Sequence, residues 1–250
     1  NAMPTLPRDW AALGPRLDRW TPPAGAFDPA GAWSLSYVRH ALIPDPSGAY
    51  GGGQAGSLAI AVKPDANAVE LRAAECVQAG NTIMTTQAEI ACAPDALLTP
   101  RAWSLKVGWQ AGPLAGASTD GLPQTRAGRA DGADLIFTAN TERRRPAPAQ
   151  WTGFWNLFAA LPRLPFAAKS ALSFDLFEDL ELSKPGQRLA YLGPQTVAFN
   201  GQTLALHVFE QTGRGVLPWR WWLDGQHRVL LAAGGRRAYL FDASTTGGAA

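Results

Sequence analysis

The sequence predicts a mainly β protein, in which one large, curved antiparallel sheet (a half-barrel or two β halves) wraps around one central amphipathic helix. Three observations support this fold class. Short runs of alternating apolar and polar residues recur along most of the chain. Dipeptides that favour tight hairpin turns punctuate its last third, and one aromatic stretch has the spacing of a helix.

The composition is that of a packed globular protein. Of 250 residues, 46% are hydrophobic and 17% are charged, so the chain can bury a large core. A net charge of +2 gives a nucleic-acid-binding role no electrostatic basis. No apolar run approaches the length that spans a bilayer, so no transmembrane segment is expected.

The N-terminal segment, residues 1–30, is rich in proline, glycine, tryptophan and arginine and predicts extended chain with a short helix. Asn1 and Ala2, before Met3, resemble the scar of a cleaved expression tag, and a natural leader peptide would be missing after such processing. The first residues are therefore left out of the fold prediction.

Residues 31–250 are predicted to form one β-rich domain. Its halves, 31–139 and 170–243, are joined by a connector and helix at 140–169, in which Arg143 to Arg145 are expected to lie in a solvated loop. The strands expected in the first half are 32–42, 57–63, 68–77, 81–92, 102–110 and 133–139.

Two cysteines lie on neighbouring strand runs. A hairpin that turns at Ala79 to Asn81 places Cys76 opposite a residue near position 84, several residues from Cys92. A disulfide needs Cα atoms within about 7 Å, so two free thiols are predicted.

The predicted helix is residues 151–161. Trp151, Phe154, Trp155 and Phe158 fall at positions i, i+3, i+4 and i+7, and Pro162 ends the pattern. This broad aromatic face is expected to pack on the sheet. The alternative is a mobile lid over a ligand groove.

The C-terminal third predicts an antiparallel meander of five strands. Asn200-Gly201, Asp224-Gly225 and Gly234-Gly235 favour two-residue hairpin turns because these residues tolerate positive φ. The expected strands are 187–199, 202–212, 218–223, 226–233 and 236–242. These turns pair Val197 with Leu204, Trp222 with His227, Trp221 with Arg228, Trp219 with Leu230, Leu230 with Tyr239, and Arg228 with Phe241.

Both faces of this meander are predicted to be apolar. One face carries Trp222 among branched aliphatic residues; the other carries aromatic residues and arginines. A sheet solvated on one side does not have this pattern, so either the helix covers the aromatic face or that face lines a groove. The candidate ligand-binding residues on it are Trp219, Trp221, Arg228, Tyr239 and Phe241, with Arg228 stacking in cation–π fashion.

Catalytic motifs are absent from the sequence. His40, His207 and His227 lie on separate strand runs without a local metal motif, and there is no Cys-x-x-Cys pattern. The nucleophile elbow Gly-x-Ser-x-Gly and the phosphate-binding loop are also missing. No metal and no cofactor are expected.

The densest acidic group is Asp175, Glu178, Asp179 and Glu181 in "FDLFEDLEL". Paired carboxylates can hydrolyse glycosidic bonds, so a hydrolase that uses Asp175, Glu178 and Asp179 is one alternative function. The spacing lacks the pattern of a calcium loop. A solvated strand end and turn is the simpler interpretation.

The turn-punctuated run "LAYLGPQTVAFNGQTLALHVFEQTGRGVLPWRWWLDGQHRVLL" (189–231) and the helix "WTGFWNLFAAL" (151–161) resemble the bacterial envelope half-barrel proteins of the lipoprotein-carrier type. In that type a strongly curved sheet wraps around a helix and leaves an apolar cavity. The resemblance implies a periplasmic or secreted location, with a cytoplasmic location left open, and binding of a lipid, another apolar ligand or an envelope protein. It transfers no functional residue.

The leading hypothesis is a non-enzymatic exported protein that binds an apolar ligand or a protein partner in the groove of a curved sheet. The carboxylate hydrolase is the second hypothesis. The third is a purely structural envelope module whose groove is filled by its own helix. Whether the protein itself occupies the aromatic face of residues 218–242 separates the first hypothesis from the third.

Overall fold

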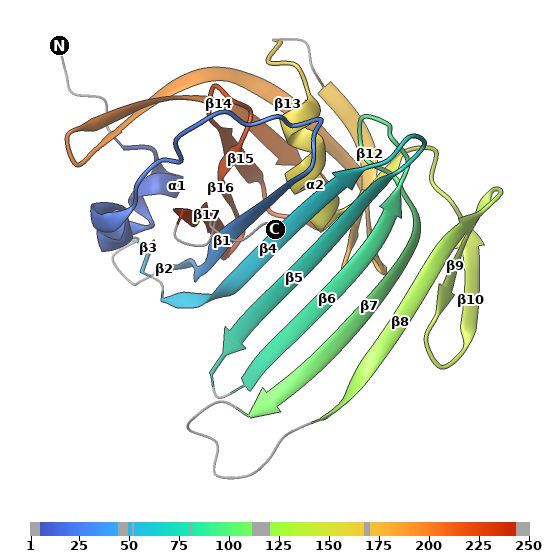
Figure 1. Ribbon diagram of the computed structural model, residues 1–250. Coiled ribbons are helices and arrows are strands. Elements are labelled where there is room, and N and C mark those ends of the chain that lie inside the picture. The colour runs from blue at the N-terminus through green and yellow to red at the C-terminus, as the bar shows by residue number, and fades with distance from the viewer. Residues whose placement is uncertain are drawn as a thin grey trace.

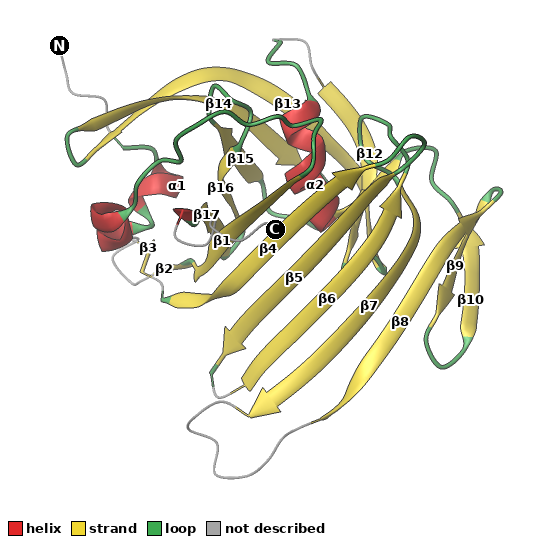
Figure 2. Ribbon diagram, viewed as in Figure 1, coloured by secondary structure: helices red, strands yellow, loops and turns green. Residues whose placement is uncertain are grey.

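The computed structural model describes residues 6–44, 50–51, 53–80, 82–111, 121–167 and 171–243. Strands dominate it, with few helices (Figures 1 and 2). The helices are α1 (Arg8–Ala11), η1 (Gly14–Arg19), α2 (Phe154–Ala160) and η2 (Leu161–Arg163). The strands are β1 (Trp33–Ala41), β2 (Ile43–Pro44), β3 (Tyr50–Gly51), β4 (Gln54–Pro64), β5 (Val69–Ala79), β6 (Thr82–Cys92), β7 (Pro100–Ala111), β8 (Gly121–Asp131), β9 (Asp134–Thr138), β10 (Glu142–Pro146), β11 (Trp151–Gly153), β12 (Ala171–Glu178), β13 (Leu182–Phe199), β14 (Gln202–Thr212), β15 (Trp219–Leu223), β16 (Val229–Gly234) and β17 (Arg237–Phe241).

Fifteen strands of the described chain form one open sheet, which confirms the predicted fold class. The strand order is β10-β9-β8-β7-β6-β5-β4-β1-β17-β16-β15-β14-β13-β12-β11. Strands β4–β10 form the N-terminal meander and strands β13–β17 form the C-terminal meander. Antiparallel pairing of β1 with both β4 and β17 joins the two meanders into one sheet. The sheet curves around α2 (Figure 1).

Helix α2 fills the inside of the curve. All seven of its residues are buried, and Trp155 and Phe158 are 2% and 0% exposed. This confirms the prediction that the aromatic helix packs on the sheet and leaves the lid interpretation without support. The helix is shorter than expected because Trp151 to Gly153 pair in parallel with β12 as strand β11.

The C-terminal meander has the predicted first hairpin. Val197 pairs with Leu204 and Phe199 with Gln202 across a turn in which Asn200 has φ 48° and Gly201 has φ 71°. Both residues lie in the left-handed region, which is the reason that an Asn-Gly pair favours this turn.

The predicted two-residue turn at Asp224-Gly225 is wrong. Trp222 pairs with Leu231 instead of His227, because residues 224–228 form a longer loop organised by one carboxylate. Asp224 Oδ1 accepts hydrogen bonds from the amides of Gln226 and Arg228, both at 2.9 Å. Such side-chain capture of backbone amides is an alternative to a tight turn.

The faces predicted for Trp219, Trp221, Trp222 and Tyr239 are nevertheless correct. The partner of Trp222 lies four residues beyond the predicted partner. Tyr239 pairs with Ala232, two residues beyond the predicted Leu230. A shift by an even number of residues keeps every side chain on its face. Trp221 therefore still shares a face with Tyr239, and Trp222 points to the opposite side.

The outer face of the C-terminal meander is covered by the N-terminal segment. The Trp10 ring lies 6.0 Å from that of Trp222 and 5.9 Å from that of Phe199, measured between ring centroids. Asn200 Nδ2 donates to the carbonyl of Leu17 at 2.8 Å. This segment is thus part of the core. Residues 1–5, with the expected tag scar, lie outside the described residues.

The two ends of the sheet approach each other through side chains. The Arg145 guanidinium lies 4.3 Å from the ring centroid of Phe137 on β9 and 4.5 Å from that of Phe177 on β12. Burial lowers the pKa of Arg145, and the positive charge of the neighbouring Arg143 lowers it further. Arg143 and Arg144 are exposed, as expected, but the expected loop is wrong: these residues form edge strand β10, in which Arg145 is half-buried and bridges the gap.

Candidate functional site

Four of the five predicted ligand-binding residues lie on the inner face of the C-terminal meander, against α2. Trp219, Trp221, Tyr239 and Phe241 are 4%, 0%, 0% and 1% exposed. The Phe158 ring lies 5.0 Å from Trp221 and 5.6 Å from Tyr239, and the Phe154 ring lies 5.0 Å from Trp219. The protein itself therefore occupies this aromatic face.

The fifth residue, Arg228, does not lie on the aromatic face, so the prediction for this residue is wrong. Its Nε donates to Asp224 Oδ2 at 2.7 Å, and its Nη1 donates to the carbonyl of Ala24 at 3.2 Å. The longer loop thus ties Arg228 to the N-terminal segment and removes it from the aromatic face. The cation over that face is Arg237, whose guanidinium lies 4.8 Å from the ring centroid of Phe154.

The acidic group occupies the end of β12 and the turn that follows. Asp175 Oδ1 accepts a hydrogen bond from the amide of Gly186 at 2.9 Å. Glu178 pairs with Arg237 at 3.5 Å and with Lys184 at 3.9 Å. These are the contacts of a strand end and a turn, which is the simpler of the two predicted interpretations.

Asp179 belongs to the turn itself. Asp179 and Leu180 have φ values of 50° and 54°, and the amide of Glu181 donates to the carbonyl of Glu178 at 3.1 Å. Burial, and then the negative charge of Glu75, raise the pKa of Asp179. Glu75 itself belongs to a second polar group, which lies inside the sheet.

This second group is centred on Glu75 of β5, which the sequence analysis missed. Glu75 Oε1 accepts from the Tyr239 hydroxyl at 2.6 Å and lies 3.4 Å from Arg39 Nε, and Glu75 Oε2 accepts from Trp155 Nε1 at 3.1 Å. The side chains of Arg39 and Glu75 are 15% and 11% exposed. The inner face of β5 carries Val69, Leu71 and Ala73 before Glu75. A carboxylate at the next inward-facing position of this apolar row was the sequence signal that could have identified Glu75.

Beyond Glu75 the inner face of the N-terminal meander continues past α2. Across β5, β6 and β7, one row of paired residues is Glu75, Thr86 and Val107. The next row, farther from α2, is Val77, Met84 and Trp109. Val77, Met84 and Val107 are half-buried and Trp109 is 40% exposed. Strands β5–β8 extend well beyond the helix (Figure 1). We call the surface of Val77, Met84, Val107 and Trp109 the open inner face.

Two histidines are stacked on one phenylalanine. The Phe166 ring lies between the rings of His207 and His227, at centroid distances of 3.7 and 3.8 Å. The Tyr191 hydroxyl lies 2.6 Å from His207 Nδ1. Burial, and then His227, lower the pKa of His207. The stack attaches the chain after α2 to the C-terminal meander.

Cys76 and Cys92 are free, as predicted. Cys92 is buried, and Asn156 Nδ2 lies 3.2 Å from its Sγ. Burial raises the pKa of this thiol to about 12, so it is not a thiolate at neutral pH. Within the ranges that the structure describes, no three histidine, cysteine or acidic side chains gather in a group suited to a metal ion.

Fold and site define a class of protein: an open, curved antiparallel sheet wrapped on one buried helix, with an apolar inner surface that extends past the helix. No helix within the described residues is long and apolar enough to cross a membrane.

Comparisons with known proteins add little to this class. No protein-family model and no curated protein matches the chain. One similar solved structure is the crystal structure of a DUF1089 family protein from Pseudomonas aeruginosa. It has a TM-score of 0.39 and 12% identity and covers 85% of this chain and 95% of the other. This similarity assigns no function, and no matched family supports the resemblance to lipoprotein carriers.

Proposed function

We propose that this is a non-enzymatic protein that binds an apolar ligand on the concave side of its sheet, at the open inner face. The aromatic face of Trp219 and Trp221 does not serve as the groove, because α2 fills it. The observation that carries the proposal is the exposed Trp109, which continues the inner apolar surface beyond the helix. A large aromatic residue on a concave surface is typical of ligand sites.

The ligand that suits this surface is an amphipathic molecule with an alkyl chain. Its apolar part would cover Met84, Val107 and Trp109, which removes apolar area from water. Its polar end would meet Arg39 and Glu75, which lie on the same face at the inner end of the apolar surface. An envelope location, periplasmic or secreted, belongs to the same proposal and rests on the resemblance to the half-barrel carriers.

The second candidate is a purely structural envelope module. One specific observation favours it: the protein's own helix occupies the aromatic face that was expected to be the groove. The carboxylate hydrolase has no comparable support, because Asp175 and Glu178 hold a strand end and a pair of cations.

A fatty acid that carries a dansyl group tests the proposal. Its fluorescence should rise on binding, and Trp109→Ala should weaken the affinity about tenfold, the equivalent of about 1.4 kcal/mol of lost contact. Leu192→Ala is the matched control, because Leu192 is 46% exposed but lies on β13, away from the open inner face. Unchanged affinity in Trp109→Ala, or no binding by the parent protein, would favour the structural module.

A further inference from the structure

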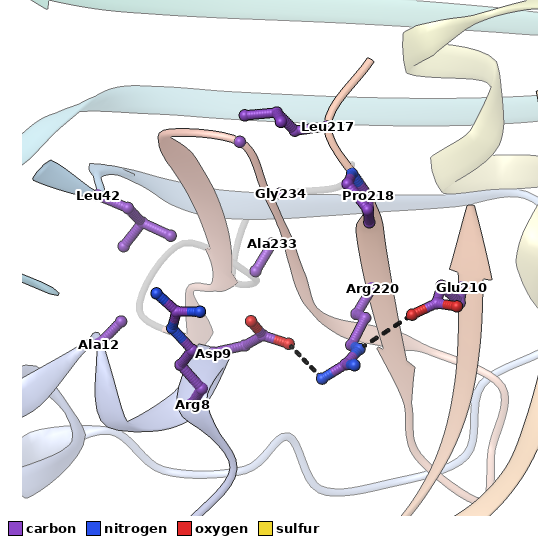
Figure 3. A pocket seen from close by; sticks show the side chains of 11 residues that line it. Arg8, Asp9, Ala12, Leu42, Glu210, Leu217, Pro218, Arg220, Ala233 and Gly234 are labelled. Atoms are coloured by element: carbon purple, nitrogen blue, oxygen red, sulfur yellow. Dashed lines mark hydrogen bonds and ion pairs between the residues drawn. The ribbon is translucent and has the colours of Figure 1, made fainter. Parts of the chain in front are cut away.

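A separate cavity lies on the other side of the sheet, between α1 and the outer face of β14–β16 (Figure 3). Its volume is about 440 Å³, within the range of small-molecule sites, roughly 300–1,000 Å³. Ala12, directly after α1, and Ala233, near the end of β16, are small residues that line this space.

One end of the cavity carries a row of alternating charges. Arg220 Nη1 lies 3.7 Å from Asp9 Oδ2, and Arg220 Nε lies 3.4 Å from Glu210 Oε1. Arg8 lines the same end, and its guanidinium points toward Leu42 (Figure 3). A cation and an anion from adjacent residues of one helix therefore face the same space.

Asp9 is the least compensated of these groups. Its Oδ2 is buried and accepts no hydrogen bond from the described residues, and the ion pair with Arg220 is long. Burial raises the pKa of this carboxyl, although the charge of Arg220 and the nearby indole of Trp222 oppose the shift. A ligand that donates a charged hydrogen bond would stabilise the carboxylate.

The opposite end of the cavity is apolar. Leu42 is buried beneath it, and Leu217, on its rim beside Pro218, is 62% exposed. Leu217 is the most exposed of the large hydrophobic residues in the described part of the chain. An apolar group placed between Leu42 and Leu217 would cover this surface.

We propose that this cavity binds an α-amino acid with a large apolar side chain. The carboxylate of the ligand would pair with Arg8 and its ammonium with Asp9, because opposite charges on one carbon match opposite charges on adjacent residues. The side chain would lie between Leu42 and Leu217. This site is independent of the open inner face, and its test does not depend on the fatty-acid result.

Three probes that share one skeleton separate the contributions of the two charges. Isothermal titration calorimetry should show binding of phenylalanine, and binding at least tenfold weaker of hydrocinnamate, which lacks the ammonium, and of phenethylamine, which lacks the carboxylate. Equal affinity for all three would mean a simple apolar crevice, and binding of hydrocinnamate alone would mean an anion site. Either result, or no binding of phenylalanine, overturns the proposal.

Substitutions locate the binding. Asp9→Asn and Leu217→Ala should each weaken phenylalanine binding about tenfold, while Asp18→Asn, an exposed carboxylate of the same N-terminal segment outside the cavity, should leave it unchanged. Leu217→Ala keeps the test decisive if Asp9→Asn unfolds, because Leu217 lies on the surface. Unchanged affinity in Leu217→Ala would place the ligand elsewhere.

Discussion

The two meanders belong to one sheet but are buried in different ways. In the C-terminal meander both faces are covered: Trp221 lies under α2, and Trp222 lies under Trp10 of the N-terminal segment. In the N-terminal meander the outer face is solvated, and its ion pair between Arg72 and Glu89 has side chains 70% and 71% exposed. Its inner face is covered only as far as α2 reaches.

This difference teaches where a binding function can lie in such a fold. The C-terminal meander, with two covered faces, is the scaffold, and its aromatic residues serve packing. The N-terminal meander keeps a stretch of apolar surface that no described residue covers fully, and Trp109 marks its far end. In this sheet, an inner-face tryptophan indicates a candidate binding site only where α2 no longer covers it.

The strongest test of the comparison replaces one inner-face tryptophan in each meander. Trp221→Ala should lower the free energy of unfolding by about 3–5 kcal/mol, the usual loss for a buried aromatic residue. Trp109→Ala should change it by no more than about 0.5 kcal/mol, as is typical of surface positions. Urea unfolding of both variants measures this, and equal losses would show that Trp109 is part of the core.

The sequence predicted the fold class and the faces of the meander because both depend on local patterns. Alternation determines the face, and the even shift of the strand pairing from Trp222 to Trp219 preserved it. The predicted register was wrong at the loop of residues 224–228 because Asp224 accepts a hydrogen bond from the amide of Arg228. This contact depends on the geometry of the whole loop, which the Asp-Gly dipeptide alone does not determine.

The candidate site was harder to predict, because its limits depend on long-range packing. Asn200 and Leu17 are far apart in the sequence, yet their hydrogen bond helps to fix the N-terminal segment over the sheet. Likewise, no local sequence pattern shows that α2 leaves the part of the inner face around Trp109 uncovered. The position of Glu75 was visible in the alternation of β5, but its partners Tyr239 and Trp155 were not.

A second test uses pH at the seam between the meanders, where His40 of β1 pairs with Ala238 of β17. His40 is 2% exposed, neither ring nitrogen has a hydrogen-bond partner in the described chain, and burial, with a smaller effect of Arg16, lowers its pKa to about 4. In the unfolded chain it titrates near 6.5. Between these values only the unfolded state binds the proton, so stability is lost as pH falls from about 6.5 to about 4.

The expected contribution of His40 to this loss is about 3 kcal/mol. Urea unfolding of the parent and of His40→Gln at pH 7 and at pH 4.5 isolates it, because other titrating groups are common to both proteins. A smaller pH-dependent loss in His40→Gln supports the buried, neutral histidine. Identical pH dependence would mean that His40 is hydrated in the folded protein.

The smallest expected effect concerns the ends of the sheet, where the two regions meet again. Glu181 Oε2 lies 2.7 Å from Arg126 Nη1 of β8, and Glu181 Oε1 pairs with Arg143 of β10. The Arg126 and Arg143 side chains are 39% and 66% exposed, so each pair should contribute only about 0.2–1 kcal/mol. Glu181→Gln should therefore lower the melting temperature slightly, and the difference from the parent protein should shrink as salt is added. A salt-independent loss above about 2 kcal/mol would show instead that Glu181, rather than Arg145 between Phe137 and Phe177, holds the ends of the sheet together.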